Sequence, residues 1–125
     1  MSLSLPDLLM HILDEINYLI SDSKELSEDF FMRDDRLKRA FSRSLEIIGE
    51  ASKKIPEEFK NKNPEIAWKL MTRMRDRLIH HYFGVDYAMV WDIVKNDIPE
   101  LKIRIENILK AEQYRKKKEN DTGNI

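Results

Sequence analysis

The sequence has 125 residues, which is enough for one domain with a substantial core but too few for two. It contains three glycines, four prolines and no cysteine, which disfavours a sheet with many turns and excludes disulfides, thiolate metal sites and a cysteine nucleophile. Charged residues make up 36% of the chain but the formal net charge is −1, so contact with a polyanion would need a local basic patch. No uncharged run reaches the roughly 20 residues of a membrane span, and no signal-peptide pattern is present; we therefore expect a cytoplasmic protein without membrane contact.

The first predicted helix begins at Ser4, which can cap it, and has Pro6 in its first turn, where the missing N–H costs nothing. Its apolar residues recur at helical spacing, namely Leu8, Leu9, Ile12, Ile16, Leu19 and Ile20. Residues 22–34 are mostly polar and aperiodic. We predict a loop there, with one short turn at most.

A second helix is predicted over residues 36–54 and is ended by Pro56. Its apolar stripe consists of Leu37, Ala40, Phe41, Leu45, Ile48, Ala51 and Ile55. Residues 56–64 are predicted to be a connector. The third predicted helix has a core face of Ile66, Ala67, Leu70, Met71, Met74 and Leu78, and Gly84 ends it.

Asp86 is predicted to cap a fourth helix, whose inward residues are Tyr87, Val90, Trp91 and Val94. The same apolar phase continues through Ile98, Leu101, Ile105 and Ile108. Pro99 must therefore either kink one long helix or begin a fifth. The sequence predicts an all-α, up-and-down bundle of four to five helices over residues 1–113, followed by a basic and polar tail, residues 114–125, that is expected to be flexible.

The segment with the most evident chemistry is residues 75–82, RDRLIHHY, near the end of the third predicted helix. On a wheel of about 100° per residue, Arg75 and Tyr82 nearly coincide at the edge of the apolar stripe. Asp76 and His80 lie one turn apart elsewhere on the helix, where a hydrogen bond between them would fix the imidazole tautomer and raise its basicity.

Arg75 and His80 project about 140° apart on an ideal helix, so one straight helix cannot easily present both to one small group. Either the helix loosens before Gly84, or a second copy brings its own segment alongside. A twofold dimer would place two arginines and two histidines around one groove, and we favour this arrangement.

Arginine and histidine together suit phosphate chemistry. The guanidinium of Arg75 can bind and stabilise phosphate oxygens, while His80 can accept a proton from a ribose hydroxyl and return one to a leaving oxygen. RNA carries its own nucleophile in the 2′-hydroxyl, so neither a metal nor another cofactor is required. Arg73 and Arg77 are candidate RNA contacts beside Asp76, which would orient His80.

Ordinary structural roles compete with this interpretation. Charged residues on a helix usually form a solvated face, and His81, which lies toward the apolar side, is expected to pack rather than to catalyse. Three histidines, two of them adjacent and pointing apart, make a poor metal site. Trp68 and Trp91 are expected to be core or interface anchors, and His11 has no obvious partner. The basic run at residues 115–118 could contact RNA phosphates, but a solvated helix end explains it equally well.

The pattern Arg-Asp-X-Leu-X-His-X-Tyr at residues 75–82 resembles the motif of the HEPN superfamily, and specifically its HepT-like toxin branch. Residues 39–51, RAFSRSLEIIGEA, are similar to the second-helix signature of that branch, and so are residues 66–68, 82–86 and 90–91 around the motif. The similarity covers nearly the whole chain. His81 departs from the pattern, because a small residue such as glycine is common there, and it could alter the shape of the groove.

The resemblance implies a HEPN-like helical bundle and a homodimeric, metal-independent endoribonuclease with Arg75 and His80 at the dimer groove. It also implies a minimal nucleotidyltransferase antitoxin as partner, in a higher oligomer in some cases. In part of the family that partner silences the toxin by transferring AMP to the tyrosine that corresponds to Tyr82. Because Tyr82 shares a helical line with Arg75, an added phosphate there would occupy the arginine and block substrate.

Two other readings of the sequence remain open. A non-catalytic helical dimer could bind a nucleotide or a nucleotidyltransferase partner through the same groove, and would show binding that depends on Arg75 but no RNA cleavage. A purely structural bundle would show neither. The RNA target is not encoded in any evident base-reading pattern.

Overall fold

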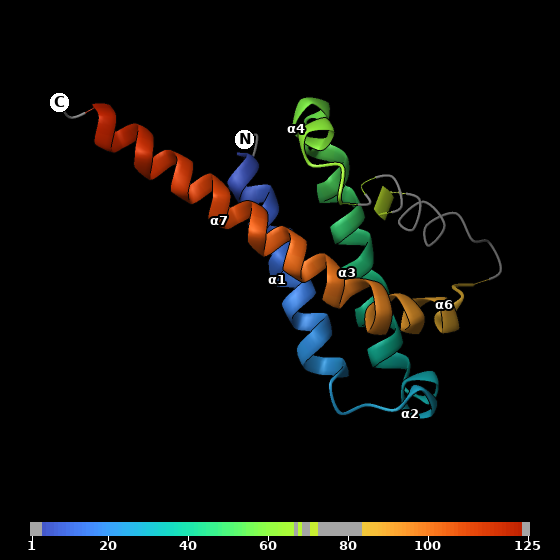
Figure 1. Ribbon diagram of the computed structural model, residues 1–125. Coiled ribbons are helices and arrows are strands. Elements are labelled where there is room, and N and C mark those ends of the chain that lie inside the picture. Colours follow the sequence, from blue (N-terminus) through green and yellow to red (C-terminus); the bar gives the residue numbers. More distant parts are fainter. Residues whose placement is uncertain (1–3, 67, 69–70, 73–83, 124–125) are drawn as a thin grey trace.

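In the computed structural model, every regular element of the described residues is a helix (Figure 1). The structure describes residues 4–66, 68, 71–72 and 84–123. The helices within these ranges are α1 (Leu5–Ser23), α2 (Glu28–Arg33), α3 (Asp35–Lys54), α4 (Glu57–Lys62), α6 (Tyr87–Asp92), the π-helical segment η1 (Ile93–Asp97) and α7 (Ile98–Gly123). The predicted all-α, HEPN-like fold class is confirmed.

Helix α1 begins where local chemistry predicts. The backbone N–H of Asp7 donates to Oγ of Ser4 over 3.3 Å, and the N–H of Ser4 donates to Oδ2 of Asp7 over 3.4 Å. This reciprocal capping box satisfies two N–H groups that a helix start leaves without partners, and Pro6 lies in the same first turn.

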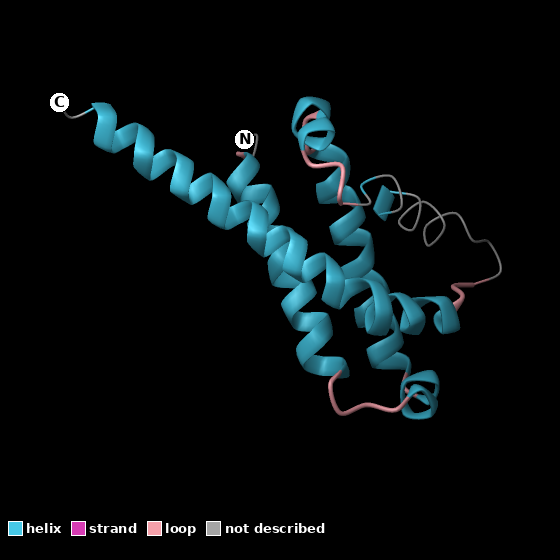
Figure 2. Ribbon diagram, in the orientation of Figure 1, coloured by secondary structure: helices cyan, strands magenta, loops and turns pink. Residues whose placement is uncertain are grey.

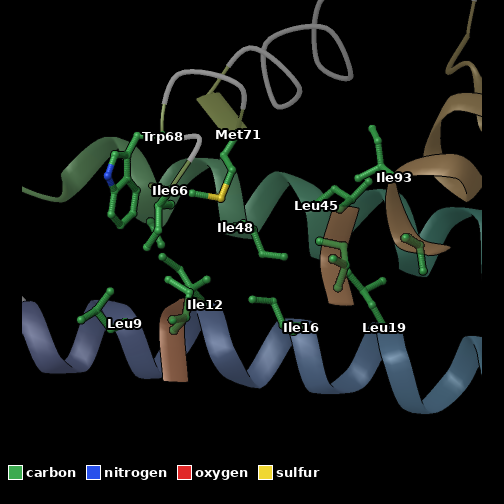
Figure 3. Close-up of a cluster of buried hydrophobic side chains, with 14 of the residues drawn as sticks. Leu9, Ile12, Ile16, Leu19, Leu45, Ile48, Ile66, Trp68, Met71 and Ile93 are labelled. Carbon is green, nitrogen blue, oxygen red and sulfur yellow. The ribbon is translucent and has the colours of Figure 1, made fainter. Parts of the chain in front are cut away.

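The core lies between α1, α3 and α7, with α1 packed against both of the others. Figure 3 shows the apolar side chains of α1 pointing toward those of α3, and toward Ile66, Met71 and Ile93. Every member of the predicted α1 stripe is buried except the half-buried Ile20. In α3 the stripe is buried at Phe41, Leu45, Ile48 and Ala51, as predicted. Of the predicted face of the third helix, Ile66 and Met71 are buried, and the remaining members lie outside the described residues.

The predicted loop at residues 22–34 is partly wrong, because it contains the six-residue helix α2 and α1 continues to Ser23. Ser27 caps α2 by accepting a hydrogen bond from the N–H of Phe30 over 3.1 Å. Phe31, which has no exposed surface, stacks on Phe41 with ring centroids 5.1 Å apart and lies 5.2 Å from the ring of Trp91. The buried ring of Phe31 therefore anchors α2, a helix too short to show an apolar periodicity in the sequence.

The predicted connector at residues 56–64 likewise contains a short helix, α4, which carries no buried residue. It has acidic residues in its first turn and lysines in its last turn, an order that favours a helix through its dipole. Helix α3 ends at Lys54, directly before Ile55 and Pro56, as the proline predicts.

The helical backbone continues through Pro99. Segment η1 ends two residues before the proline, and the N–H of Ile98 donates to the carbonyl of Ile93, five residues earlier. A π turn of this kind is one of the ways in which a helix accommodates a residue that lacks a backbone donor. Of the two predicted alternatives, the structure supports a single helical run, from α6 through η1 into α7, without an intervening loop.

Helix α7 extends far beyond the core. Among its described side chains the last buried ones are Ile108 and Leu109, and the helix continues to Gly123. The predicted division between residues 1–113 and 114–125 stays a prediction. Figure 2 shows this C-terminal part standing clear of the other helices. The flexibility expected of residues 114–125 stays a prediction.

Among the described residues, no helix is both long and apolar enough to cross a membrane.

Candidate functional site

The predicted catalytic segment, residues 75–82, lies outside the described residues. This holds for each candidate named above, namely Arg73, Arg75, Asp76, Arg77, His80, His81 and Tyr82. The wheel geometry and the dimer groove therefore remain predictions. The structure does describe the residues that precede and follow this segment.

On the N-terminal side, Trp68 and Met71 anchor the chain in the core. Trp68 is 5% exposed, its Nε1–H donates to the carbonyl of Asn63 over 3.0 Å, and its ring meets Phe59 edge to face at 6.3 Å. Met71 is 3% exposed, and Oγ of Ser52 lies 3.6 Å from its sulfur. The expectation that Trp68 is a core anchor is confirmed.

Ser52 is fully buried in α3, and its hydroxyl donates to the carbonyl of Ile48 over 2.7 Å. This hydrogen bond to the backbone satisfies the buried hydroxyl group of Ser52. It also holds the Ser52 oxygen beside the sulfur of Met71. The sequence analysis did not single out Ser52. The sequence does carry a signal that could have identified it, because Ser52 is a small polar residue that follows Ala51 on the apolar side of a predicted helix.

On the C-terminal side, Gly84 and Asp86 fix the entry into α6. Gly84 has φ of +111°, a backbone conformation that side-chain-bearing residues rarely adopt, and a Cβ added there would meet no atom within 4 Å. Two residues later, Oδ1 of Asp86 accepts a hydrogen bond from the N–H of Met89 over 3.1 Å. The predicted cap of this helix is therefore confirmed. The predicted role of Gly84 as the end of the third helix stays a prediction, because the residues before it lie outside the described ranges.

Helix α6 is itself held by aromatic and cationic contacts. Nζ of Lys38 lies 4.8 Å from the centre of the Tyr87 ring, and Val90 is fully buried. Nζ of Lys95 lies 5.4 Å from the centre of the Trp91 ring and donates to the carbonyl of Ser23 over 3.1 Å. Lys95, which the sequence analysis did not single out, thus joins the end of α1 to η1.

The remaining histidine candidate is His11. It is exposed on α1 and lines an open hollow of about 390 Å³ with Asp7, Met10 and Asp14. Within the part of the chain that the structure describes, no cluster of three or more His, Cys, Asp or Glu side chains could hold a metal ion. His80 and His81 lie outside that part, so the prediction of a metal-free site stays a prediction.

The structure thus defines an all-α domain in which a segment rich in arginine and histidine is flanked by a buried anchor and by a glycine–aspartate helix start. Residues 12–108 match the family model described as Ribonuclease HepT-like. The chain belongs to the HepT-like ribonuclease family.

Several curated proteins are similar to this chain over most of their length. It is 48% identical over 105 residues to "Putative RNase TTE0752" of Caldanaerobacter subterraneus subsp. tengcongensis, covering 84% of this chain and 94% of that protein. It is 47% identical over 104 residues to "Probable ribonuclease HepT" of Thermococcus cleftensis, covering 83% and 94%. It is 46% identical over 102 residues to "Putative RNase MJ0127" of Methanocaldococcus jannaschii, covering 82% and 84%. No solved structure shows a significant match.

Proposed function

We propose that this protein is an endoribonuclease and the toxin component of a toxin–antitoxin pair that acts in the cytoplasm. The observation that carries the proposal is family membership over residues 12–108, a range that includes residues 75–82. The names of the relatives, each 46–48% identical and each called an RNase or ribonuclease, support the same activity. The Arg-Asp-X-Leu-X-His-X-Tyr pattern supplies the residue types that such a reaction needs.

In the proposed reaction, the ribose 2′-hydroxyl attacks the adjacent phosphorus. His80 accepts the hydroxyl proton as the new P–O2′ bond forms, and the resulting imidazolium returns a proton to O5′ as the P–O5′ bond breaks. The products are a 2′,3′-cyclic phosphate and a 5′-hydroxyl. Arg75 stabilises the charge that builds on the phosphate oxygens, and Asp76 orients the imidazole. Arg73 and Arg77 contact neighbouring phosphates.

This reaction uses only groups of the chain and of the RNA, so it proceeds without a metal ion. The test is RNA cleavage by the purified protein with EDTA present, compared with the same assay on Arg75→Ala and His80→Ala. We expect each variant to lose about 10²- to 10³-fold or more in rate, the usual scale for an acid–base group or a charge-stabilising donor.

Matched controls come from described, exposed residues of the same type. His11→Ala changes an exposed histidine on α1, and Arg33→Ala changes an arginine whose side chain is 74% exposed. Both should cleave at the wild-type rate. Unchanged cleavage by His80→Ala would refute the catalytic assignment. Absent cleavage by the wild type, together with Arg75-dependent binding of a nucleotide or of the transferase, would favour the non-catalytic dimer.

We also propose that the active species is a homodimer whose groove takes Arg75 from one chain and His80 from the other. The support is the angle of about 140° between these positions on one ideal helix. Arg75→Ala and His80→Ala chains, unfolded together and refolded as a mixture, would form heterodimers with one intact Arg–His pair across the interface. We expect the mixture to recover about a quarter of wild-type activity, because half of the dimers are mixed and each has one intact pair of two. A mixture as inactive as either variant alone would place both residues of a site in the same chain.

The proposed partner is a nucleotidyltransferase antitoxin that attaches AMP to the hydroxyl of Tyr82. The AMP phosphate would then lie close to Arg75 and compete with the RNA phosphate for it. Intact-mass spectrometry after co-expression with the transferase should show added AMP that Tyr82→Phe removes. Tyr87→Phe, which changes the half-buried tyrosine beside Lys38, should still be modified. Modification that persists in Tyr82→Phe would move the acceptor elsewhere and leave the nuclease proposal intact.

A further inference from the structure

The C-terminal part of α7, residues 110–123, forms a helical arm that extends beyond the core. Among the described side chains of the helix, the last buried one is Leu109, which is 8% exposed. Beyond it, the described side chains are exposed except for the half-buried Glu112. At about 1.5 Å per residue the arm extends roughly 20 Å. Isolated helices of this length are marginal in water. Because none of the arm's described side chains is buried, packing against the core does not explain why the arm is present.

The arm concentrates positive charge in an otherwise acidic protein. Residues 110–123 contain five basic and three acidic residues, for a net charge of +2, and four of the cations are consecutive at residues 115–118. Because the whole chain has a formal net charge of −1, the other 111 residues together carry −3. Outside the proposed site at residues 73–82, the arm is therefore a region of this acidic protein that attracts a polyanion.

The spacing of the arm's charges favours a nucleic acid over a protein surface. Residues 115–118 are four successive cations. On an ideal helix of about 100° per residue, four successive positions are spread around the whole circumference. A protein partner would need one coherent face with an apolar centre, but the only apolar residues in the arm are Ala111 and Tyr114. A phosphate backbone needs only positive charge within reach, and single-stranded RNA can follow a helix from any side.

We propose that the arm binds the phosphates of the RNA substrate without reading its sequence. This inference rests on the proposed ribonuclease function and names a second contact region for the same substrate. The competing explanation is that the cations merely stabilise the C-terminus of α7 through its dipole. That explanation predicts a loss of helix content, and no loss of RNA affinity, when the cations are removed.

The test compares two pairs of adjacent lysines near helix C-termini. Lys116→Gln/Lys117→Gln neutralises the arm, and Lys53→Gln/Lys54→Gln removes the same charge from the exposed last turn of α3. Glutamine keeps helix propensity close to that of lysine. Each pair is made in a His80→Ala background to prevent cleavage. Binding of a fluorescein-labelled single-stranded RNA is then measured by anisotropy across a salt series, with circular dichroism as the check on helix content.

We expect the arm pair to weaken RNA binding about tenfold at about 0.1 M salt and to reduce the salt slope by about 1, while the α3 pair changes binding less than twofold. Equal affinity of the two variants would overturn the inference, while cleavage by the wild type would leave the nuclease proposal standing. Wild-type protein that neither binds nor cleaves RNA would refute both. If the arm pair loses dimerisation in sedimentation velocity but keeps RNA affinity, the arm binds a second copy of the chain and the RNA inference is wrong.

Discussion

The α1–α3 core and the anchors that flank residues 75–82 in the sequence are built in different ways. The core uses many equivalent apolar residues, and Leu9, Ile12, Ile16 and Leu19 of α1 each have no exposed surface. The flanking anchors use single residues with distinct tasks, such as the Ser52 hydroxyl beside Met71, the positive φ of Gly84 and the carboxylate cap of Asp86. A change in the core should therefore lower global stability without altering the chemistry. A change in an anchor should cost less stability but affect cleavage.

The largest stability effect is expected for Ile16→Ala in the core. Removing a fully buried isoleucine side chain loses its transfer free energy and leaves a cavity, at a cost of about 2–5 kcal/mol. Denaturant unfolding measures this loss, and RNA cleavage per folded molecule should be unchanged. Asn17→Ala, at the exposed neighbouring position, should cost less than about 0.5 kcal/mol. A cost below about 1 kcal/mol for Ile16→Ala would contradict the described core.

Gly84 tests the C-terminal anchor through its backbone. Because nothing lies within 4 Å of an added Cβ, Gly84→Ala should suffer from the positive φ alone, at about 1–2 kcal/mol. Gly84→Asn should cost less and Gly84→Val more, since asparagine tolerates positive φ and β-branched residues do not. The same order should appear in RNA cleavage rates measured well below the melting temperature. Equal stability of the asparagine and valine variants would show that φ at this position does not matter.

Asp86 tests the same anchor through its cap. Asp86→Ala removes the acceptor for the N–H of Met89 and should cost about 1 kcal/mol, whereas Asp86→Asn retains an oxygen acceptor and should cost less. Thermal unfolding of the two variants measures the difference. If both variants have the same melting temperature as the wild type, the cap does not contribute to the stability of α6.

The smallest effect is expected at Asp97 in η1. Partial burial raises the pKa of the Asp97 carboxyl, and the nearby carboxylates of Asp92 and Glu100 add to the rise. A raised carboxyl pKa means that the folded state disfavours the charged form. The resulting destabilisation is absent at pH values below the ordinary aspartate range and appears as pH rises through the folded pKa.

Asp97→Asn should therefore be slightly more stable than the wild type at pH 7, by at most about 0.5 kcal/mol because the side chain is largely exposed. The difference should vanish at pH 3. Unfolding curves at the two pH values check both the sign and the trend, and Glu106→Gln on α7 provides a control without this pair of neighbours. A variant less stable than the wild type at pH 7 would contradict the raised pKa.

Most of the long helices could be predicted from the sequence because their signals are local. Each of these signals lies close in sequence to the helix that it specifies. Ser4 and Asp86 cap the helices that follow them, Pro56 lies just beyond the end of α3, and the apolar periods of α1 and α3 lie within those helices. The family resemblance placed the chain correctly among the HepT-like ribonucleases, because its motifs are also short and contiguous. The roles of Arg75, Asp76, His80 and Tyr82 depend on their positions in space, and they stay predictions.

The sequence by itself determined the fold class, the start of α1, the end of α3 and most of the buried residues of α1 and α3, because periodicity and capping depend only on neighbours along the chain. Tertiary structure alone decided the existence of α2, which depends on Phe31 reaching Phe41 and Trp91 from a distant segment. It also decided how the chain passes Pro99, where a π segment keeps the helix intact and brings Lys95 to the end of α1. Contacts between residues far apart in sequence have no periodic signature, and that is why no reading of the linear chain could have supplied them.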